Sequence, residues 1–449
     1  MTTTAESTDV RVGKPLTATV AVMVLGAVMA ILDATIVNVG VETLGHHFGA
    51  SLASVEWVAT GYLLAFALTV PVAGWAAERF GARAVWLSGL TVFLLGSALS
   101  AISWSIGALI AFRILQGIGG ALLEPTMLTL LARLAGPRRA GRLLGLIGGL
   151  LPLGPVFGPM LGGLILSGLP WQWMFLVNLP LGIASLILSA RRLPRDEPGG
   201  AARLDVRGLL LLPPGFAALV YGLSGAAARG FGSPHVWVPL VLGTVLLAAY
   251  AVHGLRRAET LIDLRLFASR GFTASVVAMF GVGAMLFAVL FAVPLFFQRG
   301  RDTGVLSAGF LLAAVGVGAF IGMPLAGRLS DRVGARPLVP LGAVVAGLGS
   351  AVFALDAAPT AVLVPVMVLM GVGFGFIGAP SMAAVYRGVA PASVPSATGA
   401  IYILNQIGAA LGVAVAALLI QTHGEVSAFW WPVAAAPLVL VAGLLQPRA

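Results

Sequence analysis

The sequence contains no cysteine and very little charge. Without cysteine the chain can form no disulfide framework, no thiolate metal site and no thiol nucleophile. Only 9% of the 449 residues are charged, and a soluble domain of this length needs far more charge to cover its surface. These two absences exclude a disulfide-stapled scaffold and argue against a soluble globular protein.

Apolar residues take the place of the missing charge. They make up 59% of the chain, and the mean hydropathy is +1.03. A bilayer core about 30 Å thick requires roughly 20 apolar residues per helix, and the sequence supplies such runs almost from end to end. We predict fourteen spans: 17–40, 54–77, 84–103, 106–131, 142–167, 171–190, 208–226, 236–255, 271–297, 304–327, 337–356, 361–386, 397–420 and 428–446.

The basic residues are distributed very unevenly over the expected loops. Of the 26 Lys and Arg residues, only Arg229, Arg299 and Arg301 lie in loops on one side, and Arg113 lies inside a span. All the others fall on the opposite side, which the positive-inside rule identifies as cytoplasmic. An even number of spans then places both termini in the cytoplasm, which predicts a multi-pass protein of the inner (cytoplasmic) membrane. The same distribution explains the net charge of +10 without a nucleic-acid partner.

Two of the cytoplasmic loops repeat each other. Residues 74–83 read GWAAERFGAR and residues 327–336 read GRLSDRVGAR, so both fit G-x-x-x-[DE]-R-x-G-A-R. Topogenic charge would explain the arginines but neither the glycines nor the acid. We interpret the repeat as a charge cluster that latches neighbouring helices in one conformation and releases them in the other. The latch residues are Gly74, Glu78, Arg79, Gly81, Arg83, Gly327, Asp331, Arg332, Gly334 and Arg336.

The repeat divides the chain into two similar halves. Two parallel six-helix repeats are one of the known transporter designs. We therefore expect an all-α membrane protein with an N-terminal six-helix bundle over residues 1–190 and a C-terminal six-helix bundle over residues 271–449. Residues 191–270 are expected to form cytoplasmic linkers with two inserted transmembrane helices.

Three further segments resemble the major facilitator superfamily, and specifically its fourteen-spanning drug:proton antiporter family. Residues 32–39 (LDATIVNV) resemble the family's signature in span 1, residues 113–120 (RILQGIGG) its motif in span 4, and residues 154–163 (GPVFGPMLGG) its antiporter motif in span 5. The resemblance covers nearly the whole chain. It implies two six-helix bundles with two extra central helices, and proton-driven export by alternating access.

The chain departs from the family pattern at a few positions. Gln172 and Asn405 stand where the family usually has Arg, and Gly40-Val41-Glu42 replaces the usual Ala-Leu-Pro. These departures concern the substrate range more than the fold or the coupling.

The antiporter motif combines regularly spaced small residues with prolines. Small residues at four-residue spacing let helices pack closely in lipid, and prolines bend the helix. We interpret the motif as a bent, tightly packed seam that blocks leak between the halves. Ordinary helix packing is the alternative explanation of the same residues and contributes in any case. Its residues are Gly154, Pro155, Gly158, Pro159, Gly162 and Gly163.

Asp33 and Arg113 lie deep inside their spans, where a charge usually faces the bundle interior and has a partner. Counted from the cytoplasmic ends of spans 1 and 4, the two residues differ in depth by only ~3 Å at about 1.5 Å per residue. Burial favours the protonated acid, whereas a nearby guanidinium favours the carboxylate. We therefore predict that Asp33 carries the proton and that Arg113 tunes it; the alternative is a permanent structural ion pair.

Glu124 also lies well inside a span, and it directly precedes Pro125. Two interpretations stay open. Glu124 is either a second site of proton coupling or a first contact for a cationic substrate, or it pairs with a loop arginine such as Arg133 or Arg142.

Large rings with a few polar groups suit lipophilic cations or amphiphiles. On this ground we predict a substrate pocket formed by Asn38, Tyr62, Phe66, Phe287, Phe291, Tyr402, Asn405 and Gln406. The histidines form no cluster with ligand spacing, so no metal is expected, and no G-K-[ST] follows the glycine-rich runs as a phosphate loop requires.

The sequence as a whole predicts a proton-coupled antiporter that exports drug-like or natural-product molecules. It is expected to use the proton motive force without a cofactor and to act as a monomer, with lipid as its surroundings and with no obligate protein or nucleic-acid partner. A metabolite symporter or facilitator on the same fold is the main alternative. A membrane scaffold or receptor would lack a soluble signalling domain, and an enzyme would lack an embedded catalytic cluster.

Overall fold

The computed structural model describes residues 14–135, 153–193, 204–230, 232–257, 260–261, 264–356, 358–388 and 394–446. Every regular element in these ranges is a helix, as the apolar composition predicts. The first half contains α1 (Lys14–Ile36), η1 (Val37–Gly40), α2 (Val41–Phe48), α3 (Leu52–Phe80), α4 (Ala82–Ala101), α5 (Ile106–Ala135), α7 (Leu153–Gly168), α8 (Trp173–Leu176) and α9 (Asn178–Arg192). It is followed by α10 (Val206–Arg229), α11 (Pro234–Arg256), η2 (Leu264–Ala268), α12 (Arg270–Leu295), η3 (Phe296–Gly300), α13 (Val305–Val333), α14 (Leu338–Ala354), α15 (Thr360–Gly388), α16 (Val394–His423), η5 (Glu425–Phe429) and α17 (Trp430–Leu444).

Twelve helices in these ranges are long and apolar enough to cross a membrane, so the prediction of fourteen spans is not supported. The predicted spans 142–167 and 337–356 coincide with shorter apolar helical segments, Phe157–Gly168 and Leu338–Ala354. Residues 142–152 of the first of these predicted spans lie outside the described residues. The second, α14, has 17 residues, which at 1.5 Å per residue is about 26 Å and slightly less than the hydrocarbon core.

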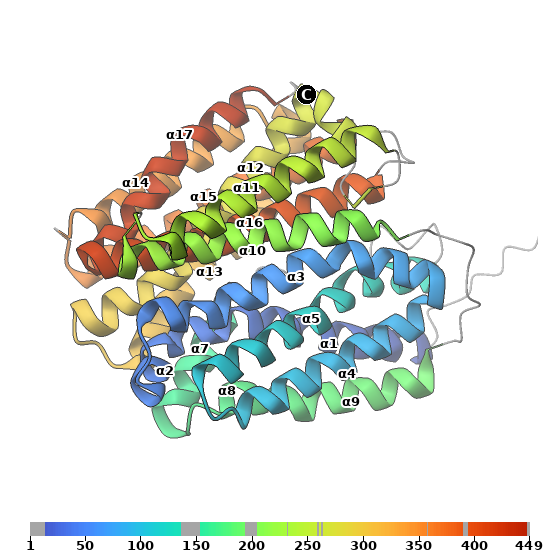
Figure 1. Cartoon of the computed structure of the whole chain (residues 1–449), viewed down its shortest axis with the longest axis horizontal. Coiled ribbons are helices and arrows are strands. Elements are labelled where there is room, and N and C mark those ends of the chain that lie inside the picture. The colour runs from blue at the N-terminus through green and yellow to red at the C-terminus, as the bar shows by residue number, and fades with distance from the viewer. Residues whose placement is uncertain are drawn as a thin grey trace, which may run out of the picture.

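The helices pack in two groups (Figure 1). In the N-terminal group, α5 packs against α3 and α4, while α1 packs against α7 and α9. In the C-terminal group, α15 packs against α13 and α14, and α12 against α16 and α17. The two groups meet along two helix pairs, α7 with α13 and α3 with α16.

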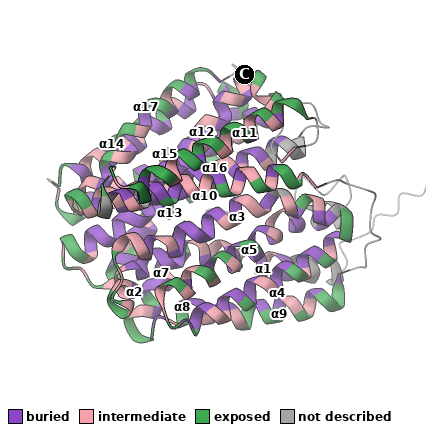
Figure 2. Ribbon diagram, viewed as in Figure 1, coloured by how far each residue is buried: buried purple, intermediate pink, exposed green. Residues whose placement is uncertain are grey.

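Helices α10 and α11 pack against each other at the boundary of the two groups. Helix α10 contacts both α3 and α16, and Figure 1 shows it running alongside them. Helix α11 lies at the periphery: only 17% of its apolar window is buried, compared with 72% for α12, and Figure 2 shows its outward face largely exposed. Such an apolar, exposed helix requires lipid around it.

The two latch segments lie at helix ends rather than in open loops. In the first, Gly74 and Arg79 belong to α3, and the chain turns at Gly81, whose φ is +90°. In the second, α13 continues to Val333 and the turn is at Gly334, whose φ is +76°. Because left-handed φ values strain residues with a Cβ atom, glycine is required at both turns. The end of the molecule with these turns is called the Arg83 end below, and the opposite end the Glu42 end.

The glycines of the antiporter motif face two different neighbours. An added Cβ atom would meet Ile31 at Gly154, Thr35 at Gly158 and Ile36 at Gly162, so these three glycines face α1 in the same group. At Gly163 it would lie 3.1 Å from the carbonyl oxygen of Val305, at the start of α13. Gly163 therefore faces α13 of the other group, while Gly154, Gly158 and Gly162 pack α7 onto α1.

Candidate functional site

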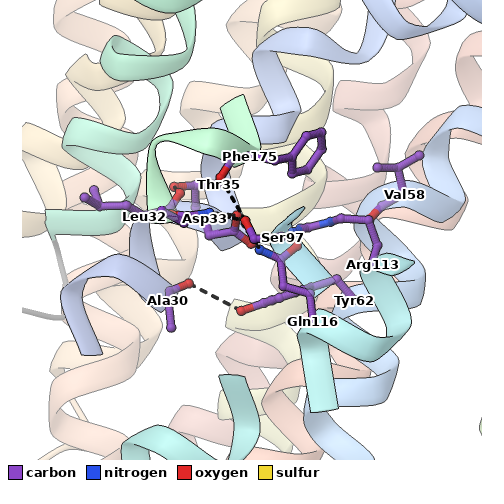
Figure 3. Close-up of polar contacts among 11 residues, drawn as sticks. Ala30, Leu32, Asp33, Thr35, Val58, Tyr62, Ser97, Arg113, Gln116 and Phe175 are labelled. Carbon is purple, nitrogen blue, oxygen red and sulfur yellow. Dashed lines mark hydrogen bonds and ion pairs between the residues drawn. The ribbon is translucent and has the colours of Figure 1, made fainter. Parts of the chain in front are cut away.

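Asp33 and Arg113 form a buried ion pair at the centre of the N-terminal group. Arg113 Nη1 donates to Asp33 Oδ2, and both side chains are fully shielded from solvent. Asp33 comes from α1 and Arg113 from α5 (Figure 3). The agreement in depth that the sequence indicates thus corresponds to a direct contact.

Two amide groups complete the coordination of the Asp33 carboxylate. Gln116 Nε2 donates to Asp33 Oδ1 at 3.0 Å and Asn178 Nδ2 donates to the same oxygen at 2.7 Å. Both amides also donate to Ser97 Oγ, at 3.2 Å and 3.0 Å. The Ser97 hydroxyl in turn donates to the carbonyl oxygen of Phe175 at 2.8 Å. The carboxylate therefore lies in a closed network that joins α1, α4, α5, α8 and α9, called the Asp33 centre below.

Arg113 is held from the side opposite to Asp33. Its Nε donates to the carbonyl oxygen of Val58 at 3.2 Å, and its guanidinium carbon lies 4.3 Å from the centre of the Tyr62 ring and 5.7 Å from that of Phe175. Such stacking stabilises a guanidinium away from water. The Nη2 atom is buried with no hydrogen-bond acceptor among the described residues, so one donor of Arg113 is unused in this conformation.

The α5 sequence explains how these groups meet. Arg113 and Gln116 are three residues apart and share one face of the helix, and Gln116 Oε1 accepts from Arg113 Nη1 at 2.6 Å. Helix α4 reaches this face because Gly96 has no side chain: an added Cβ atom would lie 2.7 Å from the backbone nitrogen of Gln116. The close approach brings the neighbouring Ser97 into hydrogen-bonding distance.

The Asp33 carboxylate is enclosed in the present conformation. It accepts hydrogen bonds from one guanidinium and two amides. Asp33 is only 1% exposed, so a proton can reach it only after this network opens.

Glu124 contacts the opposite group. The Tyr402 hydroxyl of α16 donates to Glu124 Oε1 of α5, and both side chains are half-buried. Its other predicted partners, Arg142 and the Arg133 side chain, lie outside the part of the chain that the structure describes.

The residues predicted for the substrate pocket lie in several places. The rings of Tyr62 and Phe66 are neighbours, with centres 6.2 Å apart, and Tyr402 reaches Glu124. Asn405 Nδ2 instead donates to the carbonyl oxygen of Met279 at 2.7 Å, so it joins α16 to α12. The other predicted residues are Asn38 and Phe291, which are buried, and Phe287 and Gln406, which are half-buried.

A cavity of about 400 Å³ lies elsewhere. It is lined only by apolar residues of α1, α7 and α13, including Phe157, Leu164 and Phe310, which are about half exposed. This cavity therefore opens toward the lipid-facing surface, and none of the eight predicted pocket residues lines it.

At the Arg83 end, the first latch binds within its own group. Arg83 Nη2 donates to the carbonyl oxygen of Ala190 at 2.6 Å, which joins the start of α4 to the end of α9. Arg79, Asp331 and Arg332 are exposed. An added Cβ atom at Gly74 or Gly327 would meet nothing within 4 Å, so neither glycine supports a close helix contact here.

At the Glu42 end, an ion pair that was not predicted joins the two groups. Arg299 Nε, after α12, lies 3.2 Å from Glu42 Oε1 in α2. Beside it, Gln298 Nε2 donates to the carbonyl oxygen of Val39 at 3.2 Å, and His46 Nε2 lies 3.6 Å from Glu42 Oε1. Glu42 belongs to the segment Gly40-Val41-Glu42, which departs from the family pattern. This departure was the one feature of the sequence that pointed to the contact. We call the Glu42–Arg299 pair the end clasp.

We expect Glu42→Gln to loosen the Glu42 end. A partly exposed ion pair contributes at most about 1 kcal/mol, so the population open at this end should rise up to about fivefold. The chain has no cysteine, so spin labels on cysteines introduced at Ile102 and Thr360 report the distance across this end. Arg299→Gln should increase the open population by a similar amount. Because both substitutions break the same ion pair, the double variant should open no more than either single variant. Asp356→Asn is the matched control, because Arg301 and Asp356 pair at 2.8 Å within the C-terminal group. Equal distance distributions in Glu42→Gln and the wild type would contradict a clasp.

Comparison with known proteins places the chain among transporters. The family model described as Major Facilitator Superfamily matches residues 23–413 and 275–448. The chain is 37% identical over 428 residues to the "Multidrug resistance protein B homolog" of Mycobacterium tuberculosis strain H37Rv, covering 93% of this chain and 79% of that protein. It is 34% identical over 417 residues to "Cephamycin export protein CmcT" of Amycolatopsis lactamdurans, covering 90% and 85%. The fold is similar to the crystal structure of a D-xylose-proton symporter, with a TM-score of 0.69, 16% identity and coverage of 96% and 97%.

Proposed function

This chain belongs to the Major Facilitator Superfamily, and we propose that it is a proton-coupled antiporter that exports drug-like or natural-product molecules across the cell membrane. The observation that carries the proposal is the buried Asp33 centre in a chain whose relatives are named for multidrug resistance and cephamycin export. A carboxylate at that depth is costly unless it is paired, and such residues mark proton relays and substrate paths in transporters. The proton gradient is the proposed energy source, with no cofactor, and the proposed working unit is a monomer.

We propose fourteen spans in the bilayer. Helices α10 and α11 supply two spans between the groups, and both are apolar over at least 18 residues. The shorter helices α7 and α14 would complete the count. The positive-inside pattern supports cytoplasmic termini, which makes the Arg83 end cytoplasmic and the Glu42 end external.

Alternating access would couple the proton to the substrate through the Asp33 centre. In the present conformation the end clasp bridges the two groups at the Glu42 end, and the Asp33 carboxylate accepts hydrogen bonds from Arg113, Gln116 and Asn178. If rotation of the groups moves α1 relative to α5 and α9, the carboxylate loses donors and takes up a proton. Return to the present arrangement restores the donors and expels that proton. The spare Nη2 donor of Arg113 gives the guanidinium a second binding direction during this change.

The test uses purified protein in liposomes that contain a pH dye, under an imposed proton gradient and with a panel of lipophilic compounds. We expect addition of a substrate to trigger proton movement across the membrane. Substrate flux without proton movement would instead indicate a facilitator, and proton movement in the same direction as the substrate would indicate a symporter. Protein-free liposomes and liposomes treated with a protonophore provide the background.

A further inference from the structure

Glu124 lies on the same face of α5 as Arg113. Residues 113, 117, 120 and 124 follow one another at spacings of four, three and four, which keeps them on one side of a helix. This face meets the aromatic side chains of α3. An added Cβ atom at Gly120 would lie 2.9 Å from the Tyr62 hydroxyl and 3.5 Å from the Phe66 ring. Glu124 follows one turn later, at the edge of the same aromatic surface.

Tyr62 lies between Arg113 and the Gly120 turn of α5. Its ring stacks on Arg113, its hydroxyl donates to the carbonyl oxygen of Ala30 at 3.3 Å, and an added Cβ atom at Gly120 would lie 2.9 Å from that hydroxyl. Arg113 and Glu124 are eleven residues apart, which corresponds to about 16 Å along the helix axis. The Glu124 carboxyl is therefore a group separate from the Asp33 centre.

Glu124 is paired differently from Asp33. Asp33 has a guanidinium as its partner, whereas Glu124 accepts a hydrogen bond from the neutral Tyr402 phenol. Tyr402 comes from α16 in the C-terminal group, so the Glu124 carboxyl lies where the two groups meet. Among the described side chains no basic group pairs with Glu124, whose hydrogen-bond partner is Tyr402. A half-buried carboxylate beside this ring attracts a cation, and the ring face adds cation–π attraction.

On the basis of the proposed function, we propose that Glu124, Phe66 and Tyr402 form a subsite for the positive charge of an organic cation substrate. In the present conformation the Tyr402 hydroxyl occupies the carboxylate. A bound cation would displace the Tyr402 hydroxyl from the carboxylate. The subsite thus selects cations over uncharged compounds of similar shape, while proton coupling stays with Asp33.

Equilibrium binding of two probes to purified protein tests this subsite. Tetraphenylphosphonium is a large aromatic cation, and triphenylphosphine oxide is an uncharged compound that carries three of the same rings. We expect Glu124→Gln, which keeps the shape and a hydrogen-bond acceptor, to weaken tetraphenylphosphonium binding at least tenfold. Binding of triphenylphosphine oxide should change by less than about twofold. Equal weakening of both probes, no change in either, or no binding of tetraphenylphosphonium by the wild type would overturn the subsite.

A second variant keeps the test decisive if Glu124→Gln folds poorly. Tyr402→Phe retains the ring but removes the competing hydroxyl, so it should change tetraphenylphosphonium affinity in the wild-type background. The same substitution should have no effect when combined with Glu124→Gln, because the carboxylate through which it acts is then absent. A Tyr402→Phe effect of equal size in both backgrounds would contradict a shared site.

The subsite and the proposed function can fail separately. If Glu124→Gln leaves the ratio of the two affinities unchanged while the wild type still exchanges protons for another compound, the subsite is wrong and the antiporter stands. If no compound moves protons in the wild type but the charge selectivity at Glu124 is present, the protein binds cations without being an antiporter.

Discussion

Asp33→Asn is expected to abolish proton-coupled export. The asparagine amide has nearly the shape of the acid and can still accept from Gln116 and Asn178, but it cannot take up or release a proton. In the liposome assay we expect substrate-triggered proton movement to fall to background and accumulation against a gradient to fall at least tenfold. Proton-driven export at the wild-type rate in Asp33→Asn would rule out Asp33 as the carrier.

The same substitution leaves Arg113 buried with its charge unpaired. Loss of one member of a buried ion pair destabilises a protein by about 3–5 kcal/mol, so folding has to be measured alongside transport. The double variant Asp33→Asn, Arg113→Gln removes both charges and should recover much of the lost thermal stability while remaining uncoupled. Asp356→Asn, at an exposed ion pair, controls for the chemistry of the substitution and should retain export. Recovery of coupling in the double variant would show that stability, not proton transfer, limited the single variant.

The sequence alone indicates the pairing at the Asp33 centre but not its full coordination. Hydropathy locates the spans, and counting residues from the cytoplasmic ends brings Asp33 and Arg113 to one depth. Gln116 could also have been predicted as a member of this centre, because it lies three residues from Arg113 on the same helical face. Ser97 and Asn178 could not have been predicted, since their positions depend on how α4 and α9 rotate about their axes. That rotation is set by close contacts such as Gly96 against Gln116. The hydrophobic periodicity of the sequence does not reveal such contacts.

The ends of the helices are predicted least well, for a related reason. Glu56 lies only two residues inside the predicted span 54–77, whereas α3 begins at Leu52 and buries Glu56 completely. The latch segments were expected between spans, whereas α3 and α13 extend through most of them. Charged residues at helix ends resemble loop residues in composition, so hydropathy ends a span before the helix itself ends. Within the two latch segments the chain turns at Gly81 and Gly334.

The contact between α7 and α13 should control whether the two groups can close at the Glu42 end. An added Cβ atom at Gly309 of α13 would lie 2.5 Å from the carbonyl oxygen of Pro159 and 3.2 Å from Gly163 Cα. A backbone carbonyl in a helix cannot move aside as a flexible side chain can. A side chain at this position must therefore push the two helices apart.

We accordingly expect Gly309→Val to reduce export at least tenfold, and Gly309→Ala to have a smaller effect of the same kind. The distance between spin labels at Ile102 and Thr360 should increase in the order wild type, Gly309→Ala, Gly309→Val, because the closed arrangement becomes progressively less accessible. Gly304→Val is the matched control: an added Cβ atom there meets nothing within 4 Å, and the extended backbone at Gly304, with φ −58° and ψ 151°, accepts a β-branched residue. Wild-type export by Gly309→Val would mean that α7 and α13 do not need to approach this closely during transport. Loss of export with an unchanged label distance would instead place the defect in helix packing rather than in closure of the Glu42 end.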